Sequence, residues 1–189
     1  MSTVAIPAVP ELAGPRVRLR ALGAGDVDAL FALHSDPEVM RYWSYPPWRE
    51  RAEAEAHVVR IARERESTET YPWATTLHGD DTLIGTVTLF GIHREHLRAV
   101  LGYALARRHQ GRGLASEAVG LAIAFAFGPL GLERIEADID PDNVASCRLV
   151  ERAGFLREGY LRERWRVGGG VQDTALYGLL RRDWIARRS

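Results

Sequence analysis

A basic turn with two glycines, placed directly before a strongly apolar segment, constrains the fold of this chain most. The turn reads RRHQGRG over residues 107–113, and LASEAVGLAIAFAFGPLG follows it over residues 114–131. Gly111 and Gly113 lack a Cβ, so the backbone there can adopt positive φ and approach another group closely. If a helix begins near Gly113, its unpaired N–H groups and positive dipole end point back into the turn and form an anion site. The segment therefore fits either a phosphate-binding turn or a plain helix N-terminus with glycines easing the loop.

The net charge of the chain is zero, so any anion site must depend on groups close to it rather than on an overall positive charge. The chain has 189 residues, which suits one domain, and its 25 basic and 25 acidic side chains cancel. No overall field therefore favours nucleic acid or an anionic membrane as a partner. Every basic residue is an arginine, because the sequence contains no lysine. This excludes a Walker-type phosphate loop, a pyridoxal phosphate enzyme and a Schiff-base aldolase, which all need a lysine.

The sequence predicts a single domain in a reducing compartment, without a metal site. We expect residues 1–15 to be a short lead-in and residues 16–189 to form one domain. No apolar run reaches transmembrane length, and the lead-in lacks the basic region and apolar core of a secretory signal. Cys147 is the only cysteine, which excludes an internal disulfide and favours a cytoplasmic location. His93 and His96 have ligand-like spacing without a further cluster, so we expect an exposed turn there and no bound metal.

Hydrophobic periodicity and turn residues predict the order of the elements. Asp26 is placed to cap the first helix and Asn143 to cap a later one, while Gly128 and Pro129 should stop the apolar helix. The full prediction is a strand at 16–22, helices at 26–34 and about 47–66, three antiparallel strands between 71 and 106, a buried helix at 114–127, a strand at 134–140, a helix at 143–154, and strands at about 155–166 and 171–180.

This order and the turn motif resemble the GNAT superfamily of acyl-coenzyme A N-acyltransferases. The signature of that family is Arg or Gln, two residues, Gly, one residue, then Gly or Ala, and RHQGRG at 108–113 meets it. The second half is similar to the ribosomal-protein N-terminal (alanine/serine) acetyltransferase branch, through N-x-x-S at 143–146 and G-F-x-x-E-G at 154–159. The resemblance implies an α+β fold in α/β/α layers. Its single mixed, mostly antiparallel central sheet would be splayed at the acyl-CoA site, with helices on both faces.

The resemblance also implies acetyl-CoA as the acyl donor and places its binding site. The strand LGYALA would splay from RIEADI, and its backbone near Leu105 and Ala106 would pair with the pantetheine arm. Amides from about Gln110 to Ala115 would hold the pyrophosphate. The residues expected to bind the cofactor are Leu105, Ala106, Arg108, Gln110, Gly111, Arg112, Gly113, Leu114, Ala115, Asn143 and Ser146.

Carried over from the same branch, Ser146 is the candidate catalytic acid or hydrogen-bond donor to the departing thiolate. Ser146 matches the serine of N-x-x-S, and Asn143 would cap the helix and contact the cofactor. A purely structural interpretation, with Asn143 as N-cap and Ser146 as a first-turn helix residue, fits the same pattern.

Two carboxylates are the candidate catalytic bases. Glu136 and Asp138 alternate with Asp140, so the three side chains project from one face of a strand beside the expected splay. Asp138 stands where some related N-terminal acetyltransferases carry a catalytic glutamate, whereas Trp165 replaces the glutamate proposed for the ribosomal-protein branch. A water chain is the alternative, because an α-amine with a pKa of about 8 is partly neutral at pH 7.

The expected reaction is transfer of an acetyl group to a primary amine by direct attack in a ternary complex. The branch resemblance favours the N-terminal α-amine of a protein or peptide. The alternatives are a small amine such as an antibiotic or amino acid, and a noncatalytic acyl-CoA sensor. The linker aromatics Tyr42, Trp43, Tyr45 and Trp48 fit both acceptor contact and helix packing. Neither nucleic acid nor a membrane is expected as a partner, and a homodimer is compatible with the sequence.

A dinucleotide-binding fold is the main rival explanation of the glycine turn. Gly111 and Gly113 follow a strand, and Glu136 lies about 20 residues beyond them, near the spacing of a ribose-binding acid. However, Ser116 occupies the third glycine position, and antiparallel strands precede the turn. The rival therefore fits the sequence less well.

Overall fold

The computed structural model describes residues 9–67 and 70–188, which contain one eight-stranded sheet. The strands are β1 (Leu12–Ala13), β2 (Val17–Ala21), β3 (Tyr71–Leu77), β4 (Asp80–His93), β5 (Arg98–Leu105), β6 (Arg134–Ile139), β7 (Leu156–Val167) and β8 (Gly170–Leu180). The helices are α1 (Val27–His34), α2 (Pro37–Met40), α3 (Arg51–Ser67), α4 (Leu114–Phe127), α5 (Val144–Ala153) and α6 (Arg181–Ala186), with short 3₁₀ turns η1 (Ala24–Asp26) and η2 (Arg107–His109). Strand order is β1-β2-β3-β4-β5-β6-β8-β7, and every adjacent pair is antiparallel except β5 and β6.

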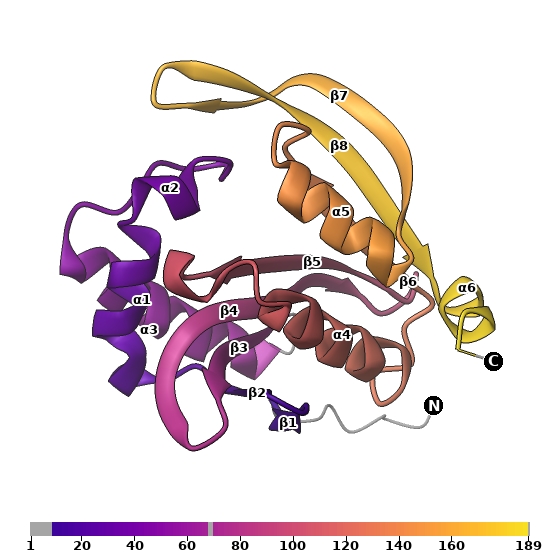
Figure 1. Ribbon diagram of the computed structural model, residues 1–189, viewed down its shortest axis with the longest axis horizontal. Coiled ribbons are helices and arrows are strands. Elements are labelled where there is room, and N and C mark those ends of the chain that lie inside the picture. The colour runs from indigo at the N-terminus through magenta and orange to yellow at the C-terminus, as the bar shows by residue number, and fades with distance from the viewer. Residues whose placement is uncertain (1–8, 68–69, 189) are drawn as a thin grey trace.

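Helices cover both faces of the sheet (Figure 1), and two apolar cores lie between the helices and the sheet. Helices α4 and α5 pack with the larger core, where Tyr71 and Trp73 of β3 meet Phe125 of α4 with ring centroids 5.2 and 5.4 Å apart. Helices α1 and α3 bury Leu30 and Ile61 in a second core. The predicted layered α+β fold, with a mostly antiparallel sheet between helices, is confirmed.

Strands β5 and β6 pair only over the first part of each strand. Their register runs from Arg98 opposite Arg134 to Val100 opposite Glu136 and stops there. Strand β6 remains paired with β8 as far as Ile139, so it leaves the second half of β5 together with the β7–β8 hairpin. Figure 1 shows this hairpin arching away from the half of the sheet formed by β2 to β5. The predicted splay between LGYALA and RIEADI is confirmed.

The start of α1 differs from the sequence prediction. Asp26 does not cap the helix, because its carboxylate accepts hydrogen bonds from Arg20 at 2.7 and 2.9 Å and from the Gly23 amide at 2.9 Å. The guanidinium on β2 forms a charge-assisted pair that is stronger than a bond to a neutral helix amide. Asp26 is consequently buried beside β2, and η1 leads into the helix.

Several short elements and one helix start also differ from the prediction. Strand β1 lies inside the 1–15 lead-in and pairs with β2, while α2 and α6 are too short to show helical periodicity. Helix α3 begins at Arg51 rather than near residue 47. The Glu53 carboxylate accepts from the amides of Arg49 and Glu50, just before the helix, at 2.6 and 3.0 Å. Asn143 does cap α5, accepting from the Ser146 amide at 3.1 Å, and Gly154 ends the helix with φ of 106°.

Candidate active site

The glycine turn joins β5 to α4 in the conformation that its sequence predicts. Gly111 and Gly113 have positive φ values of 71 and 77°, and α4 begins at Leu114. The amides of Leu114, Ala115 and Ser116 donate to no acceptor among the described residues, because they belong to the first helical turn. A Cβ at Gly111 would meet only open space. Free amides, the helix dipole and an accessible backbone therefore fit a bound pyrophosphate.

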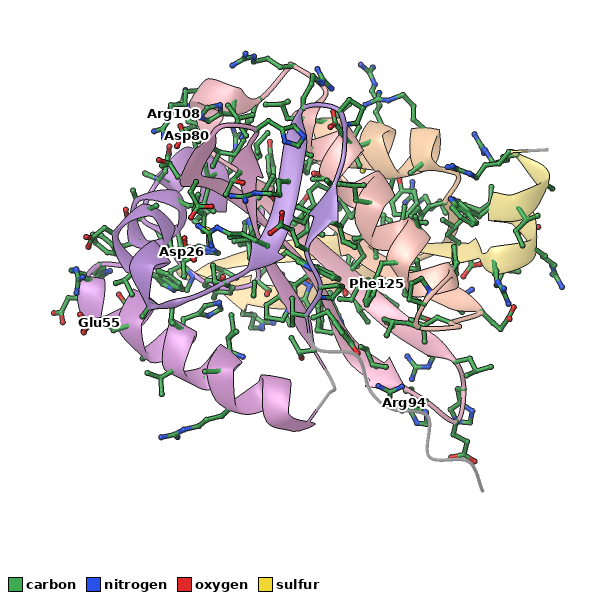
Figure 2. The ribbon with its side chains drawn as sticks, turned by 90° about the horizontal axis from the view of Figure 1, so that it is seen from below. Asp26, Glu55, Asp80, Arg94, Arg108 and Phe125 are labelled. Carbon is green, nitrogen blue, oxygen red and sulfur yellow. The ribbon has the colours of Figure 1, made fainter. Side chains whose placement is uncertain are left out.

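Two side chains of the turn make hydrogen bonds, one to the end of β5 and one within the turn. Gln110 donates to the Leu105 carbonyl at 2.8 Å, and Arg108 donates to the ring of His109 at 3.0 Å. Figure 2 shows Arg108 at the same edge of the molecule as Asp80. These two bonds occupy the Gln110 side-chain amide and the Arg108 Nε. The backbone amides of the turn are therefore better placed than these two groups to contact a phosphate.

The edge of β5 that faces the splay carries open backbone groups. Ala106 is not among them, since its N–H donates to Ile84 at 2.9 Å and its carbonyl accepts from His109 at 2.8 Å. Successive strand residues point their backbone groups to opposite sides, so Tyr103 and Leu105 face the splay. Tyr103 was not predicted, although a step of two residues back from Leu105 would have found it. The backbone edge that fits a pantetheine arm therefore runs through Tyr103 and the N–H of Leu105 rather than Ala106, since the Leu105 carbonyl already accepts from Gln110.

A cavity of about 750 Å³ lies within the splay. The edges of β5 and β6, the start of α5, the linker after α2 and the β7–β8 hairpin all line it. Four predicted site residues are brought together there, namely Glu136, Asp138, Asn143 and Ser146. Among the described residues, those of the glycine turn lie outside this cavity. Ala106 and Arg108 instead line a smaller cavity of about 250 Å³ beside α1 and α2.

Ser146 lies in the first turn of α5 with its main chain fixed on both sides. Its amide donates to Asn143 Oδ1, and its carbonyl accepts from the Tyr103 hydroxyl at 3.4 Å, which bridges β5 and α5 across the splay. Burial raises the pKa of Tyr103 to about 12, so this hydroxyl keeps its proton and remains a donor. The Ser146 hydroxyl makes no hydrogen bond to another described residue, which leaves it available to a group in the cavity.

Glu136 lies at the closed end of the splay in a network of ion pairs. Its carboxylate accepts from Arg98 at 3.2 Å and from Arg134 at 2.8 Å, and Arg134 also pairs with Glu158. The network lies over Gly178 of β8, where a Cβ would come within 2.6 Å of the Glu158 oxygens. Because guanidinium groups hold both of its oxygens, Glu136 is placed as an ion-pair partner rather than as an unengaged carboxylate.

Asp138 and Asp140 line the same cavity but differ in exposure and in hydrogen bonding. Asp138 is exposed and makes no hydrogen bond or ion pair with another described residue. Asp140 is half-buried and accepts from the Asp142 amide at 2.8 Å; its burial outweighs this bond and raises its pKa. Asp138 is therefore the predicted base whose carboxylate is unengaged.

The β7–β8 hairpin adds wall residues that the sequence did not reveal. The ladder shifts register just before Trp165, and Glu163 within this bulge has φ of 52°. Asp173 on β8 accepts from the Tyr160 hydroxyl and from the Glu163 amide at 2.7 Å, and these bonds lower its pKa. Trp165 donates to Thr174 at 3.1 Å, so its ring is fixed in the wall where the ribosomal-protein branch has a glutamate.

Two of the four linker aromatics line the cavity, and three of them, including Trp43, pack against buried His34. Tyr42 and Trp43 line the cavity. Trp48 stacks on buried His34 with centroids 4.4 Å apart, and the Tyr45 hydroxyl lies 3.1 Å from His34 Nδ1. Only the first pair is placed to contact an acceptor.

Two further features bear on alternative functions. Among the described residues, no group of three His, Cys, Asp or Glu side chains is arranged to hold a metal, and His93 and His96 stack on each other at 4.2 Å. Within residues 9–67 and 70–188, no helix is long and apolar enough to cross a membrane.

Residues 16–156 match the family model of the Acetyltransferase (GNAT) domain. This chain belongs to the GNAT acetyltransferase family. The protein named "Uncharacterized N-acetyltransferase p20" from Bacillus licheniformis is 34% identical over 169 residues, covering 89% of this chain and 95% of that protein. The crystal structure of spermidine N-acetyltransferase from Vibrio cholerae in complex with CoA and spermine has a TM-score of 0.82 at 26% identity, covering 91% of this chain and 99% of that one. The protein named "Putative ribosomal N-acetyltransferase YdaF" from Bacillus subtilis is 33% identical over 105 residues, covering 56% of this chain and 57% of that protein.

Family membership establishes the type of reaction and the acyl donor. The protein is an acyl-CoA-dependent N-acetyltransferase that uses acetyl-CoA and an amine acceptor. Because the cosubstrate is acetyl-CoA, a dinucleotide-binding fold is no longer needed to explain this chain. The names of the relatives include two acceptor classes, ribosomal and polyamine, so they leave the acceptor of this chain open.

Proposed function

We propose that this enzyme acetylates the N-terminal α-amine of a protein or peptide by direct attack in a ternary complex. The observation that carries the proposal is the cavity in the splay, which Tyr103, Asp138 and Ser146 line together. A hydrogen-bonding strand edge, an unengaged carboxylate and an unengaged hydroxyl thus face one space. The N-x-x-S and G-F-x-x-E-G elements and the similarity to YdaF support an α-amine as acceptor.

Cofactor binding is assigned to the turn and to the open edge of β5. The amides of residues 111–116 would hold the pyrophosphate, and the backbone of Tyr103 and Leu105 would pair with the pantetheine arm. When bound, acetyl-CoA supplies a thioester carbon that an amine can attack. Asn143 Oδ1 already accepts a hydrogen bond from the Ser146 amide, so the NH₂ group of Asn143 remains for a cofactor contact.

Two proton movements accompany the transfer. A bond forms between the amine nitrogen and the acetyl carbon while the C–S bond breaks, so the nitrogen must lose a proton and the thiolate must gain one. Asp138 accepts the proton, directly or through water. Ser146 donates a hydrogen bond to the sulfur, and solvent supplies the proton that the thiolate gains while Asp138 releases its proton to solvent. A weak base is sufficient, because an α-amine with a pKa of about 8 is partly neutral at pH 7.

A polyamine is the second candidate acceptor. Asp138, Asp140 and Asp173 all line the cavity, and three carboxylates in one wall would attract a multiply charged amine. The similar Vibrio cholerae structure is a complex with CoA and spermine. Arg134 and Arg164 line the same cavity, but Arg134 is paired with Glu136 and Glu158, so the N-x-x-S and G-F-x-x-E-G elements, rather than charge, favour the α-amine.

Thiol release from acetyl-CoA distinguishes the two acceptors. The assay compares peptides that begin with Ala or Ser with spermidine, and the same peptides with a blocked N-terminus serve as matched controls. We expect kcat/KM for the free peptides to exceed that for spermidine by about tenfold or more, and no release with blocked peptides. A higher kcat/KM for spermidine would replace the proposal with the second candidate, and no release with either class would refute both.

A further inference from the structure

Arg16 and Glu117 connect the start of β2 to the first turn of α4, directly beside the glycine turn. Glu117 Oε1 accepts from the amides of Arg16 and Val17 at 2.7 and 2.9 Å, and its Oε2 accepts from Arg16 Nε at 2.8 Å. Arg16 Nη1 then donates to the carbonyl of Arg112 at 2.8 Å. One guanidinium therefore contacts both the helix and the turn.

This connection is tightly packed. A Cβ on Gly14 would lie 2.6 Å from Glu117 Oε1, and a Cβ on Gly113 would lie 3.3 Å from Arg16 Nη2. The Glu117 side chain is only 13% exposed, whereas that of Arg16 is 53% exposed. Partial burial opposes the charge of Glu117, but the bonds from Arg16 and Val17 outweigh it and hold the pKa of Glu117 below its usual range.

The bonded carbonyl belongs to the residue between the two glycines of the turn. Arg112 lies between Gly111 and Gly113, which both have positive φ and no Cβ to resist rotation of the peptide plane. In a trans peptide the C=O and the following N–H point in opposite directions. Fixing the Arg112 carbonyl on the Arg16 side therefore directs the Gly113 N–H to the opposite side.

We propose that Arg16 is a positioning residue for the pyrophosphate, which keeps the Arg112–Gly113 peptide in the orientation that presents its N–H to the cofactor. Arg16 acts through the Arg112 carbonyl, and Glu117 in turn holds the guanidinium through Nε. The proposal concerns the cofactor alone, so it stands whichever amine is the acceptor.

Calorimetric titration of the acetyl-CoA-free protein tests this role without relying on activity. In Arg16→Gln, the dissociation constants of coenzyme A and of dephospho-coenzyme A should both rise about tenfold, because both ligands carry the pyrophosphate. The ratio between the two constants should stay unchanged, since the 3′-phosphate does not depend on this peptide. Arg18→Gln is the matched control, because Arg18 lies two residues further along, on β2, and pairs with Asp81 and Glu11 instead.

A second variant disturbs the connection without altering Arg16. Gly14→Ala should weaken both ligands in the same way by pushing Glu117 aside, whereas Gly25→Ala, whose Cβ would meet open space, should not. Hydrogen exchange of the Glu117 amide, which donates to the Gly113 carbonyl at 3.1 Å, should accelerate in Arg16→Gln and Gly14→Ala without ligand present. Unchanged affinity in both variants would overturn the proposal. Weaker binding with unchanged exchange would also overturn it, because Arg16 would then not act through the turn.

Discussion

Ser146 presents its hydroxyl to the cavity while Asn143 and Tyr103 fix its main chain. Ser146→Ala should lower kcat by about 10² and leave acetyl-CoA affinity within a few-fold, because a bond to sulfur strengthens only as negative charge develops there. Steady-state kinetics beside calorimetric binding checks this. Asn143→Ala is the comparison, since loss of the cap costs about 1 kcal/mol and should change melting temperature and KM together. An unchanged kcat in Ser146→Ala would remove it from the role of acid.

The two candidate bases should respond differently to loss of charge. Asp138→Asn should lower kcat by about 10² if the unengaged carboxylate accepts the amine proton. Glu136→Gln should alter kcat much less, because Arg98 and Arg134 already hold the Glu136 oxygens. Parallel kinetics of the two variants on one acceptor measures the contrast. Equal losses would argue against Asp138 as the base, and no loss in either variant would favour a water chain.

Residue roles were predictable where the partner is close in sequence. The Asn143 cap depends on an amide three residues away and was found from the sequence, whereas Asp26 was assigned wrongly because its partner Arg20 comes alongside only once β2 and η1 have formed. The alternation that places Glu136 and Asp138 on one face was also visible. Which of them is engaged was not predicted: Arg134, two residues before Glu136, was a visible signal, whereas Arg98 comes from a different strand.

At the scale of elements, the backbone of the glycine turn should matter more than its exposed side chains. Gly111→Val and Gly113→Val should each weaken acetyl-CoA binding by about tenfold or more, because a branched side chain is strained at positive φ and obstructs approach to the amides. Arg112→Ala should change affinity only a few-fold, since the carbonyl bonded to Arg16 is retained. Calorimetry on the three variants provides the comparison, and equal, small losses would mean that the turn does not hold the pyrophosphate.

The packing of the α2–α3 linker on α1 should make stability depend on pH. Burial, followed by the charge of His57, lowers the pKa of His34 to about 3, below an unfolded value near 6.5. Between these values the unfolded chain binds a proton that the folded protein does not, so the free energy of unfolding should fall as pH decreases through this window. His34 would contribute about 1.4 kcal/mol per pH unit.

Denaturant unfolding between pH 7 and pH 4 measures this dependence. His34→Phe should show a shallower slope than the wild type, because the ring stack with Trp48 is kept and the titrating group is lost. His96→Gln, at an exposed position, should keep the wild-type slope. Identical slopes in all three proteins would contradict the assignment of this pH dependence to His34.

Elements with strong local signals were found from the sequence. Alternation marked β2, turn residues marked the β3–β4 hairpin, and apolar density with Gly128 marked α4. The bulge in β7 was not found, because it contains no glycine and its Glu163 amide is bonded to Asp173 on the neighbouring strand. Elements as short as β1 and α2 cannot display a period.

For the whole molecule, the sequence pattern predicted the order of helices and strands along the chain, whereas the layers came from the family resemblance and the strand order was not predicted. The splay was expected only through resemblance to a family, because whether β5 pairs with β6 over three residues or over its full length depends on contacts across the fold. Tyr103 joins β5 to α5 across that opening, so the cavity is defined by tertiary structure rather than by one motif.

The central claim is that the glycine turn and the splay together bind acetyl-CoA. The melting temperature with coenzyme A, compared with NAD(H) at the same concentrations, tests it most directly. A ligand at about 100 times its dissociation constant adds roughly 2.7 kcal/mol of stability, so coenzyme A and acetyl-CoA should raise the melting temperature clearly while NAD(H) should not. A clear rise with NAD(H) and none with coenzyme A would contradict the account.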